Sequence, residues 1–307
     1  MSLKVLSIEE FREIKKEFAS AIGFFDGVHL GHQLVINNAI SYARRNHIKS
    51  LVITFDKSPK IVLGSAENVG YLTPIDEKLR ILKEMGVDYA LILKFDERFL
   101  SLSSSEFISK YLLKIRTRYV SVGFDFKFGH GGNGDSNSLL CNGGFKVEIS
   151  EPVLMYENKV STTQIKKCLM LGDLKSVNQM LGRNLSVSGK VVRGKQLGRT
   201  IGFPTANIKL DEDYLFALRG AYATISYIDG VSFMSMTNIG FNPTTNLYES
   251  ISIETHIFDF DSDIYGKRLR TEFLAKIRDE VKFDSLDELV AQLEQDKKTI
   301  TLIPIGD

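Results

Sequence analysis

The sequence is poor in the features that mark secreted, cysteine-rich or membrane proteins. It has two cysteines, too few for a disulfide framework or a cysteine-rich zinc site. Its 39 basic and 38 acidic residues leave a formal net charge of +1, which gives no overall field to recruit nucleic acid or an anionic membrane. No apolar run approaches the roughly 20 residues that span a bilayer, and the first ten residues contain no signal-peptide core. We therefore expect a cytoplasmic protein without a nucleic-acid or membrane partner, whose oligomeric state the sequence leaves open.

What the chain does have is the length of two globular domains. At 307 residues, the chain is longer than a typical domain with one hydrophobic core, and its length suits two domains of about 150 residues each. The pattern becomes β-rich near residues 181–186, so we predict an N-terminal domain over residues 1–183 and a C-terminal domain over residues 184–307. Both cysteines, Cys141 and Cys168, lie in stretches that read as helical, and we expect both to be buried structural thiols.

The N-terminal half alternates short apolar runs with amphipathic segments, which indicates an α/β domain with a parallel, Rossmann-like sheet. Helices should run from about Pro74 to Met85, ended by Gly86, and from Ser103, whose spacing to Glu106 is that of a capping box. Another helix is predicted where apolar residues repeat on one helical face, namely Ile36, Ala39, Ile40 and Ala43. The predicted strands are Ala19–Phe25, Ser50–Phe55, Tyr89–Phe95, Tyr119–Gly123 and Phe145–Ile149. In such sheets, ligands bind beyond the carboxyl ends of the strands.

The segment after the first predicted strand is the main candidate site of this half. It reads Gly-Phe-Phe-Asp-Gly-Val-His-Leu-Gly-His over residues 23–32. The glycines permit close approach of the backbone to a ligand, and the start of the following helix suits a phosphate. His29 and His32 are three residues apart, so both rings can face one bound group and donate hydrogen bonds to phosphoryl oxygens. Two histidines alone would equally suit surface or capping roles, but their position after a glycine-containing strand end favours a phosphate site.

A second anion site is predicted at the start of a later helix. Ser161 and Gln164 have the spacing of a capping box before an apolar helical run. A plain helix cap is the simplest interpretation of this segment. It is compatible with a functional one, because a capped helix start with Lys166 in its first turns attracts anions.

The C-terminal half reads as a small antiparallel β-barrel with a terminal helix. The connections between its predicted strands are too short for crossover helices, and Asp229-Gly230 is a strong hairpin signal. The last helix should begin at Ser285, capped with Glu288. It should bury an apolar face that consists of Leu286, Leu289, Val290 and Leu293. The predicted strands are Ser186–Val192, Ala221–Ile228, Val231–Ile239, Ile251–Phe258 and Leu269–Ile277.

A glycine-rich, basic string over residues 189–207 is the main candidate site of the C-terminal half. Its composition indicates a flexible loop that covers phosphates, with a pair of ordinary β-turns as the alternative. Thr205 and Asn207 alternate on a short strand, so both side chains face one side. A hydroxyl and an amide oxygen are hard ligands that suit Mg²⁺ held between ATP phosphates. The glycines and basic residues concerned are Gly189, Lys190, Gly194, Gly198, Arg199 and Gly202.

The N-terminal motifs resemble those of the nucleotidylyltransferase superfamily. His29-Leu30-Gly31-His32 matches its histidine-x-glycine-histidine signature, and the longer string over residues 23–33 is similar to its FMN adenylyltransferase branch. Residues 122–129 and 161–166 resemble two further elements of that branch, the second of which contacts ATP phosphates in the family. The resemblance implies that His29 and His32 are catalytic. It implies nucleotide binding by Gly23, Phe25, Gly31, Ser161, Thr162, Thr163 and Lys166, and flavin binding by Asp125, Phe126 and Phe128.

The C-terminal string resembles the riboflavin kinase module, whose proline-threonine-alanine-asparagine motif is intact over residues 204–207. Residues 237–244 are similar to its flavin-side loop, and residues 253–260 to its glutamate strand, which implies that Glu254 is the catalytic base. Without the resemblance, Glu254 would be one of many strand carboxylates, and we expect His256 to be a generic edge-strand histidine. The resemblance further implies Mg²⁺ ligation by Thr205 and Asn207, nucleotide binding by Gly189, Lys190, Gly198, Arg199 and Gly202, and flavin binding by Asn238, Gly240 and Arg278.

Together, these motifs resemble the bacterial bifunctional riboflavin kinase/FMN adenylyltransferase family, often called FAD synthetase, over nearly the whole chain. The resemblance implies that ATP phosphorylates riboflavin to FMN and then adenylylates FMN to FAD, with Mg²⁺ as cofactor. Four residues depart from the family pattern, namely Lys57, Ser58, Gly132 and Lys166. They leave open a monofunctional riboflavin kinase with a degenerate N-terminal nucleotide-binding or regulatory domain. A non-catalytic flavin sensor is the alternative from another class.

Overall fold

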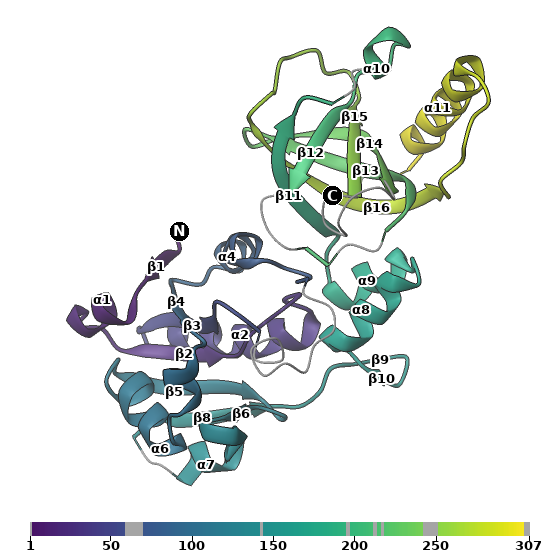
Figure 1. Ribbon diagram of the computed structural model, residues 1–307. Helices are drawn as coiled ribbons and strands as arrows, with labels where there is room; N and C mark the ends of the chain where they lie inside the picture. The colour runs from purple at the N-terminus through teal and green to yellow at the C-terminus, as the bar shows by residue number, and fades with distance from the viewer. Residues whose placement is uncertain are drawn as a thin grey trace. The chain divides into compact units, whose positions relative to one another are not determined.

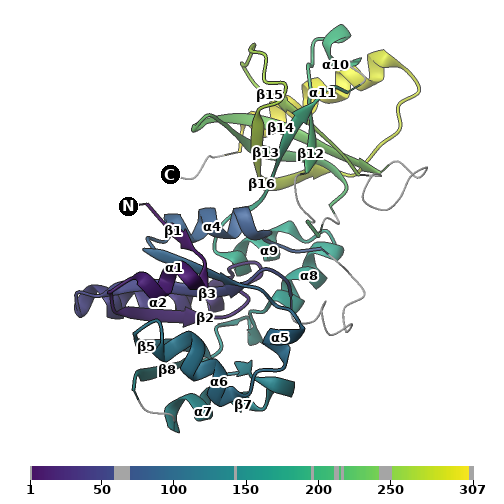
Figure 2. The same ribbon diagram turned by 60° about the vertical axis from the view of Figure 1, so that its left-hand side comes forward.

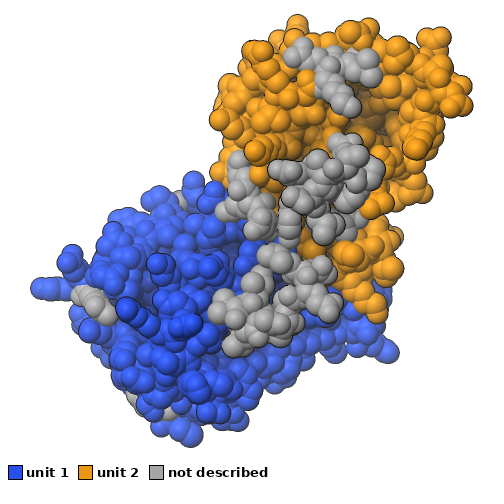
Figure 3. Space-filling view, in the orientation of Figure 1, with its two compact units in different colours: residues 1–164 blue, residues 165–307 orange. Residues whose placement is uncertain are grey.

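The chain forms two compact units, residues 1–164 and residues 165–307, which Figure 3 colours separately. The computed structural model describes residues 2–58, 70–141, 144–194, 197–210, 214–215, 218–241 and 251–303. The domain limits of 1–183 and 184–307 stay a prediction, which would assign α8 (Thr162–Met170) and α9 (Leu174–Leu181) to the N-terminal domain. Within the described ranges, no helix has the length and apolar character that crossing a membrane requires.

The N-terminal unit is built on a parallel sheet, which confirms the predicted Rossmann-like class. Six strands among the described residues pair in the order β1-β4-β3-β2-β5-β8, all parallel. The five predicted strands are confirmed with small shifts of their ends. The edge strand β1 was not predicted, because three residues are too few to show the alternation of side chains that marks a strand. The strands are β1 (Lys4–Leu6), β2 (Phe18–Ile22), β3 (Lys49–Phe55), β4 (Tyr89–Leu93), β5 (Thr117–Gly123) and β8 (Lys146–Ser150).

Helices cover both faces of this sheet, because successive strand residues point to opposite sides. Ala19 and Ala21 of β2 pack with α2 and α4, whereas Phe18 and Ile22 pack with α1, α6 and α7. Figure 2 shows α6 and α7 together on one side of the sheet and α4 on the other. The helices are α1 (Ile8–Glu13), α2 (Leu30–Arg45), α4 (Ile75–Glu84), α5 (Glu97–Leu100), α6 (Ser104–Phe107) and α7 (Ser136–Cys141).

The predicted helix ends are confirmed where local chemistry decides them. Gly86 follows α4 with φ 85°, a conformation that favours glycine. Ser103 caps α6 in a capping box, in which its Oγ accepts from the Glu106 amide at 3.2 Å and the Glu106 carboxylate accepts from the Ser103 amide at 3.0 Å. The chain then continues as a π-helix over Ile108–Leu113. Small two-residue strands form the pairs β6 (Lys127–Phe128) with β7 (Gly134–Asp135), and β9 (Leu154–Met155) with β10 (Asn158–Lys159).

The expectation of two buried thiols is wrong for one cysteine. Cys168 in α8 is buried, but Cys141 at the end of α7 is exposed, because only the opposite side of that short helix, with Ser136 and Leu139, is buried. We therefore expect Cys141 alone to react rapidly with a thiol reagent such as DTNB in the folded protein, and Cys168 only after unfolding. Cys141→Ser should abolish the fast reaction. Two fast-reacting thiols in the native protein would contradict the structure.

The C-terminal unit is a closed barrel, as predicted. Six described strands pair antiparallel in the closed order β11-β12-β15-β14-β13-β16 (Figure 1). Asp229 and Gly230 join β13 to β14 with φ values of 50° and 86°, the two left-handed residues of a type I′ hairpin turn. The strands are β11 (Leu185–Val192), β12 (Ala206–Leu210), β13 (Gly220–Ile228), β14 (Val231–Phe241), β15 (Ile251–Ile257) and β16 (Arg268–Arg278).

The terminal helix α11 (Leu286–Thr301) begins at its predicted cap, where Ser285 Oγ accepts from the Glu288 amide at 3.2 Å. Its predicted buried face is wrong. Leu286 is 52% exposed, and the buried residues of the helix are Asp296 and Ile300. Leu289, Val290 and Leu293 are half-buried. Leu289 and Leu293 line a cavity, and Leu293 also packs against the cluster of Met236, Phe258 and Ile300. Helical spacing indicates which side of a helix is apolar, but not how far along its axis that side is covered.

Candidate active sites

The loop between β2 and α2 forms the core of the N-terminal site. Phe25 and Val28 have positive φ values of 53° and 40°, which non-glycine residues adopt only where the surroundings hold them. The buried Asp26 carboxylate does so by accepting from the backbone amides of Leu72 at 2.8 Å and Thr73 at 3.0 Å. The loop is therefore pre-organised at the carboxyl end of the sheet, where ligands of such folds bind.

A buried lysine also holds this loop. Lys78 of α4 is 2% exposed, and its ammonium group donates to the Phe24 carbonyl oxygen at 2.6 Å. The Thr54 hydroxyl at the end of β3 donates to the same oxygen at 2.9 Å. Sequence reasoning missed Lys78, because a lysine on an amphipathic helix reads as solvent-facing and no local signal marks it as buried.

The two predicted histidines are brought together at the start of α2. His29 caps the helix, and its Nδ1 accepts from the His32 amide at 3.3 Å. The Nδ1 of His29 is thus an acceptor, which places the proton of the neutral ring on Nε2, where it can be donated to a phosphate. The two rings stack with centroids 3.6 Å apart, and the Phe25 ring lies edge-on to His32 at 5.3 Å. This arrangement suits stabilisation of negative charge on one bound group.

The neighbouring glycines make room for these rings. A Cβ on Gly31 would lie 3.2 Å from His29 Cε1, and one on Gly23 would lie 2.8 Å from the Phe25 ring. Both glycines therefore have a packing role that is independent of a nucleotide. Their predicted nucleotide contacts stay a prediction.

The segment over residues 161–166 meets the same loop. Ser161 Oγ accepts from the Gln164 amide at 3.2 Å, which confirms the predicted cap bond. Thr162 Oγ1 donates to the Asp26 carbonyl oxygen at 2.9 Å, so this helix start is joined to the histidine loop. Thr163 is exposed and Lys166 half-buried in α8. Two motifs far apart in sequence are thus in contact, which spacing along the chain could not establish.

The aromatic segment after β5 lies at the same end of the sheet. Phe126 stacks on Phe128 with centroids 5.6 Å apart, and Phe128 is buried against Phe107 in the core. Asp125 forms an exposed ion pair with Lys159 at 2.7 Å. Of the three predicted flavin-binding residues, Asp125 is exposed, Phe128 is buried and Phe126 is half-buried. Their flavin contacts stay a prediction.

One of the four departures from the family pattern has a local explanation. Gly132 has φ 68°, a conformation in which an arginine would be strained. Nothing in the structure explains Lys57, Ser58 or Lys166. Residues 59–69, which follow this segment, lie outside the described residues.

The C-terminal site is a cavity of about 270 Å³ in the barrel unit. It brings together five of the predicted site residues, namely Gly198, Thr205, Asn238, Glu254 and Arg278. The other predicted residues of this half do not line it, namely Gly189, Lys190, Arg199, Gly202, Asn207 and Gly240. Part of the predicted flavin-side loop, residues 242–244, lies outside the described residues.

Glu254 lies at the centre of the polar contacts in this cavity. Asn207 of β12 and Asn238 of β14 are its register partners on either side. Thr205 Oγ1 donates to Glu254 Oε2 at 3.4 Å, and Ser252 Oγ donates to Oε1 at 3.2 Å. The Glu254 carboxylate therefore has two hydroxyl groups within hydrogen-bond distance, and the cavity is also lined by Asn238.

Two of the predicted phosphate-loop glycines are required by the barrel itself. A Cβ on Gly189 would lie 2.3 Å from the Lys209 carbonyl oxygen on the paired strand β12. A Cβ on Gly198, in α10 (Leu197–Thr200), would lie 2.2 Å from the Phe203 carbonyl oxygen. Close backbone approach therefore explains both without a ligand, and their nucleotide contacts stay a prediction.

Arg278 is held by a buried carboxylate that sequence reasoning missed. Asp296 of α11 is 1% exposed, and its Oδ2 accepts from Arg278 Nε at 2.8 Å. Gln292 donates to the other oxygen at 2.8 Å, and Arg278 Nη1 donates to the Asp279 carbonyl oxygen at 3.2 Å. The guanidinium is therefore fixed at the cavity wall. An acidic residue in a charged helix reads as exposed, so nothing local distinguishes Asp296.

The prediction that His256 is an edge-strand histidine is wrong. β15 lies between β12 and β14 in the closed barrel, and His256 is 8% exposed and lines the cavity beside Glu254. Burial lowers the pKa of His256 below its usual value, against a smaller opposing effect of its hydrogen bond to Pro204. The ring is therefore neutral at neutral pH.

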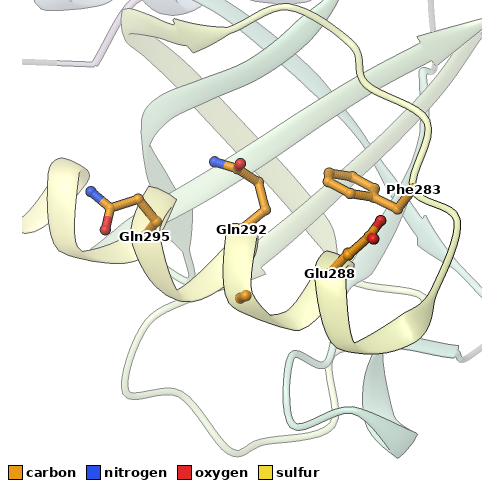
Figure 4. Close-up of a pocket in the computed structure, with 5 residues that line it drawn as sticks. Phe283, Glu288, Gln292 and Gln295 are labelled. Carbon is orange, nitrogen blue, oxygen red and sulfur yellow. The ribbon is translucent and has the colours of Figure 1, made fainter.

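A second hollow, of about 390 Å³, lies along α11 and contains no predicted site residue. Figure 4 shows Glu288, Gln292 and Gln295 along the helix, with Phe283 near the first of them. No group of three or more histidine, cysteine, aspartate or glutamate side chains in the described part of the chain could hold a metal ion.

Family models match both units. One described as FAD synthetase matches residues 11–164, and one described as riboflavin kinase matches residues 181–303. The parallel sheet with its histidine pair and the barrel with its glutamate-lined cavity thus define a two-domain class of flavin-processing transferases. Within that class, the chain belongs to the bifunctional riboflavin kinase/FMN adenylyltransferase family, as its full-length relatives show.

The relatives are similar over almost their entire length. The bifunctional riboflavin kinase/FMN adenylyltransferase of Listeria monocytogenes is 37% identical, over 95% of this chain and 94% of the relative. The proteins of the same name from Bacillus subtilis and Escherichia coli are both 36% identical, over 93% and 91% of this chain and 93% and 90% of the relatives. A crystal structure described as a macrolide-efflux protein from Streptococcus pneumoniae has a TM-score of 0.87 and 32% identity, covering 98% of this chain and 99% of that one. Macrolide efflux is not the activity named for the curated relatives, and the TM-score establishes the shared fold.

Proposed function

We propose that this chain phosphorylates riboflavin to FMN in its barrel unit and adenylylates FMN to FAD in its α/β unit, with ATP as the donor in both reactions. The observation that supports the proposal is that Thr162 is bonded to the loop of the histidine pair in the α/β unit, while Thr205 and Glu254 line one cavity in the barrel unit. The full-length likeness to relatives named for both activities supports two activities over the kinase-only and flavin-sensor alternatives.

In the barrel, Glu254 would act as general base. It accepts the proton of the ribityl 5′-hydroxyl while that oxygen attacks the γ-phosphorus of ATP, and the bond from that phosphorus to the ADP oxygen breaks. Thr205 contacts Glu254, and Asn207 is its register partner on β12. Their hydroxyl and amide oxygens are the ligands that would hold Mg²⁺, which protein sites commonly hold through few side chains together with substrate phosphates. Bound there, the ion would neutralise charge on the ATP phosphates.

In the α/β unit, the FMN phosphate would attack the α-phosphorus of ATP, and pyrophosphate would leave. No strong base is required, because a phosphate monoester with a second pKa of about 6 is already largely dianionic at neutral pH. Catalysis then consists of positioning and charge stabilisation by His29, His32 and Lys166 together with the starts of α2 and α8.

The proposal is tested by chromatography of products formed with ATP and Mg²⁺, once from riboflavin and once from FMN. We expect FMN and then FAD from the first substrate, and FAD from the second. Removal of Mg²⁺ with EDTA should abolish phosphorylation, and added Mg²⁺ should restore it. FMN without FAD would instead support the kinase-only alternative, and flavin binding without ATP consumption would support the sensor.

A further inference from the structure

We propose that His256 is a positioning residue for riboflavin phosphorylation, which holds the Pro204-Thr205 segment against β15 so that Thr205 and Glu254 face one another. The inference rests on the proposed kinase function and deepens it. The motifs that carry the family resemblance assign His256 no role.

Few backbone pairs hold the Pro204-Thr205 segment against β15. In the described part of the barrel, the register of β12 with β15 comprises two residue pairs, Ala206 with Thr255 and Asn207 with Glu254. Immediately before Ala206 the chain leaves the ladder. At that point His256 Nδ1 lies 2.8 Å from the Pro204 carbonyl oxygen. Because a carbonyl oxygen can only accept, Nδ1 carries the proton and donates it. The histidine thus extends the connection between the strands beyond their last backbone pair.

This bond lies next to the reacting groups. Thr205 directly follows Pro204, and Glu254 precedes His256 by two residues, on the same face of β15. Thr205 Oγ1 and Glu254 Oε2 are 3.4 Å apart, and the cavity is lined by Thr205, Glu254 and His256 alike. Since proline restricts its own φ, fixing its carbonyl also fixes the direction in which the chain enters Thr205. Displacing reacting groups by about 1 Å can cost about a hundredfold in rate.

The imidazole is itself fixed by packing. Its ring centroid lies 5.1 Å from that of Phe203 and 5.6 Å from that of Phe258, at interplanar angles of 59° and 54°. The ring is 8% exposed and neutral at neutral pH, so it presents one donor in one direction. A rigid side chain with a single bond to the catalytic segment is suited to positioning rather than to proton transfer.

Three substitutions separate the hydrogen bond from the packing. Asparagine at position 256 places an amide N–H where Nδ1 lies, glutamine places its amide near the position of Nε2, and leucine fills the space without a donor. We expect His256→Leu and His256→Gln to lower kcat for FMN formation at least about tenfold, while KM for riboflavin changes less than about threefold. His256→Asn should recover kcat to within about threefold of the unaltered chain. ATP binding without turnover and the near-UV circular dichroism of the full chain report whether the barrel of each variant is folded, because FAD formation from added FMN takes place in the other unit.

Unchanged kcat in His256→Leu, or equal losses in the asparagine and glutamine variants, would overturn the inference and leave His256 a packing role. If the barrel of His256→Leu fails to fold, the comparison of asparagine with glutamine still decides, since both are polar and similar in size. Absence of FMN with the unaltered chain would overturn the proposed kinase function and this inference with it. If the unaltered chain forms FMN and only the variants are slower, the defect is due to the substitution of His256 and leaves the proposed kinase function in place.

Discussion

Replacing Glu254 by glutamine is expected to lower kcat for riboflavin phosphorylation at least about a hundredfold, the usual contribution of a general base. Glutamine keeps the shape of the side chain and can still accept a hydrogen bond from Thr205, but it cannot take up the proton of the attacking hydroxyl. The affinity for ATP, measured by calorimetry, should therefore change little. The rate of FMN formation, measured by chromatography, gives the effect directly.

The matched control is Glu272→Gln on β16. Glu272 accepts from the Tyr227 hydroxyl at 3.2 Å and from the Arg270 guanidinium, and it does not line the cavity. The Glu272→Gln variant should form FMN at the rate of the unaltered chain, and both variants should keep FAD formation from FMN. Equal turnover of the unaltered chain and Glu254→Gln would reject Glu254 as the base.

Replacing both His29 and His32 by asparagine is expected to lower the rate of FAD formation from FMN by about a hundredfold to a thousandfold, because two donors to the transferring phosphate are lost. Asparagine is chosen because it is a favourable helix cap. It preserves the capping role of His29 at the start of α2, so the loss is not a consequence of a frayed helix. Product analysis by chromatography measures the rate.

His47 provides the control for this substitution. It follows the other end of α2 with φ 54°, a conformation that asparagine tolerates well, so His47→Asn should leave FAD formation intact. FMN formation from riboflavin, in the barrel unit, should persist in the double variant. Normal FAD formation by the double variant would show that adenylyl transfer does not use this histidine pair.

Features set by neighbouring residues were predicted correctly. The helix caps at Ser103 and Ser285 and the turn at Asp229-Gly230 each depend on a few adjacent side chains and their backbone preferences. The strand and helix alternation of the first half and the short connections of the second likewise indicated the two fold classes. The motifs around His29 and Glu254 were recognisable because each is contiguous in sequence.

Burial that depends on distant elements was not predictable. Lys78, Asp296 and His256 each look like ordinary polar residues of a helix or a strand, and each is buried because another element closes over it. Cys141 and Leu286 show the converse. Both were predicted to be buried from their neighbours in the sequence, and both are exposed. In each case the deciding partner is far away along the chain or absent from that side of the element.

The amino-acid sequence by itself determined the class of each unit, the family and the positions of the motifs, because periodicity, caps, turns and contiguous motifs are short-range properties. Only the tertiary structure decided that Thr162 joins the histidine loop, that Asp296 holds Arg278, and that His256 bonds to Pro204. These contacts join residues brought together by the order of strands in the sheet and the closure of the barrel. Pairing across such distances depends on the packing of the whole unit, which no local pattern encodes.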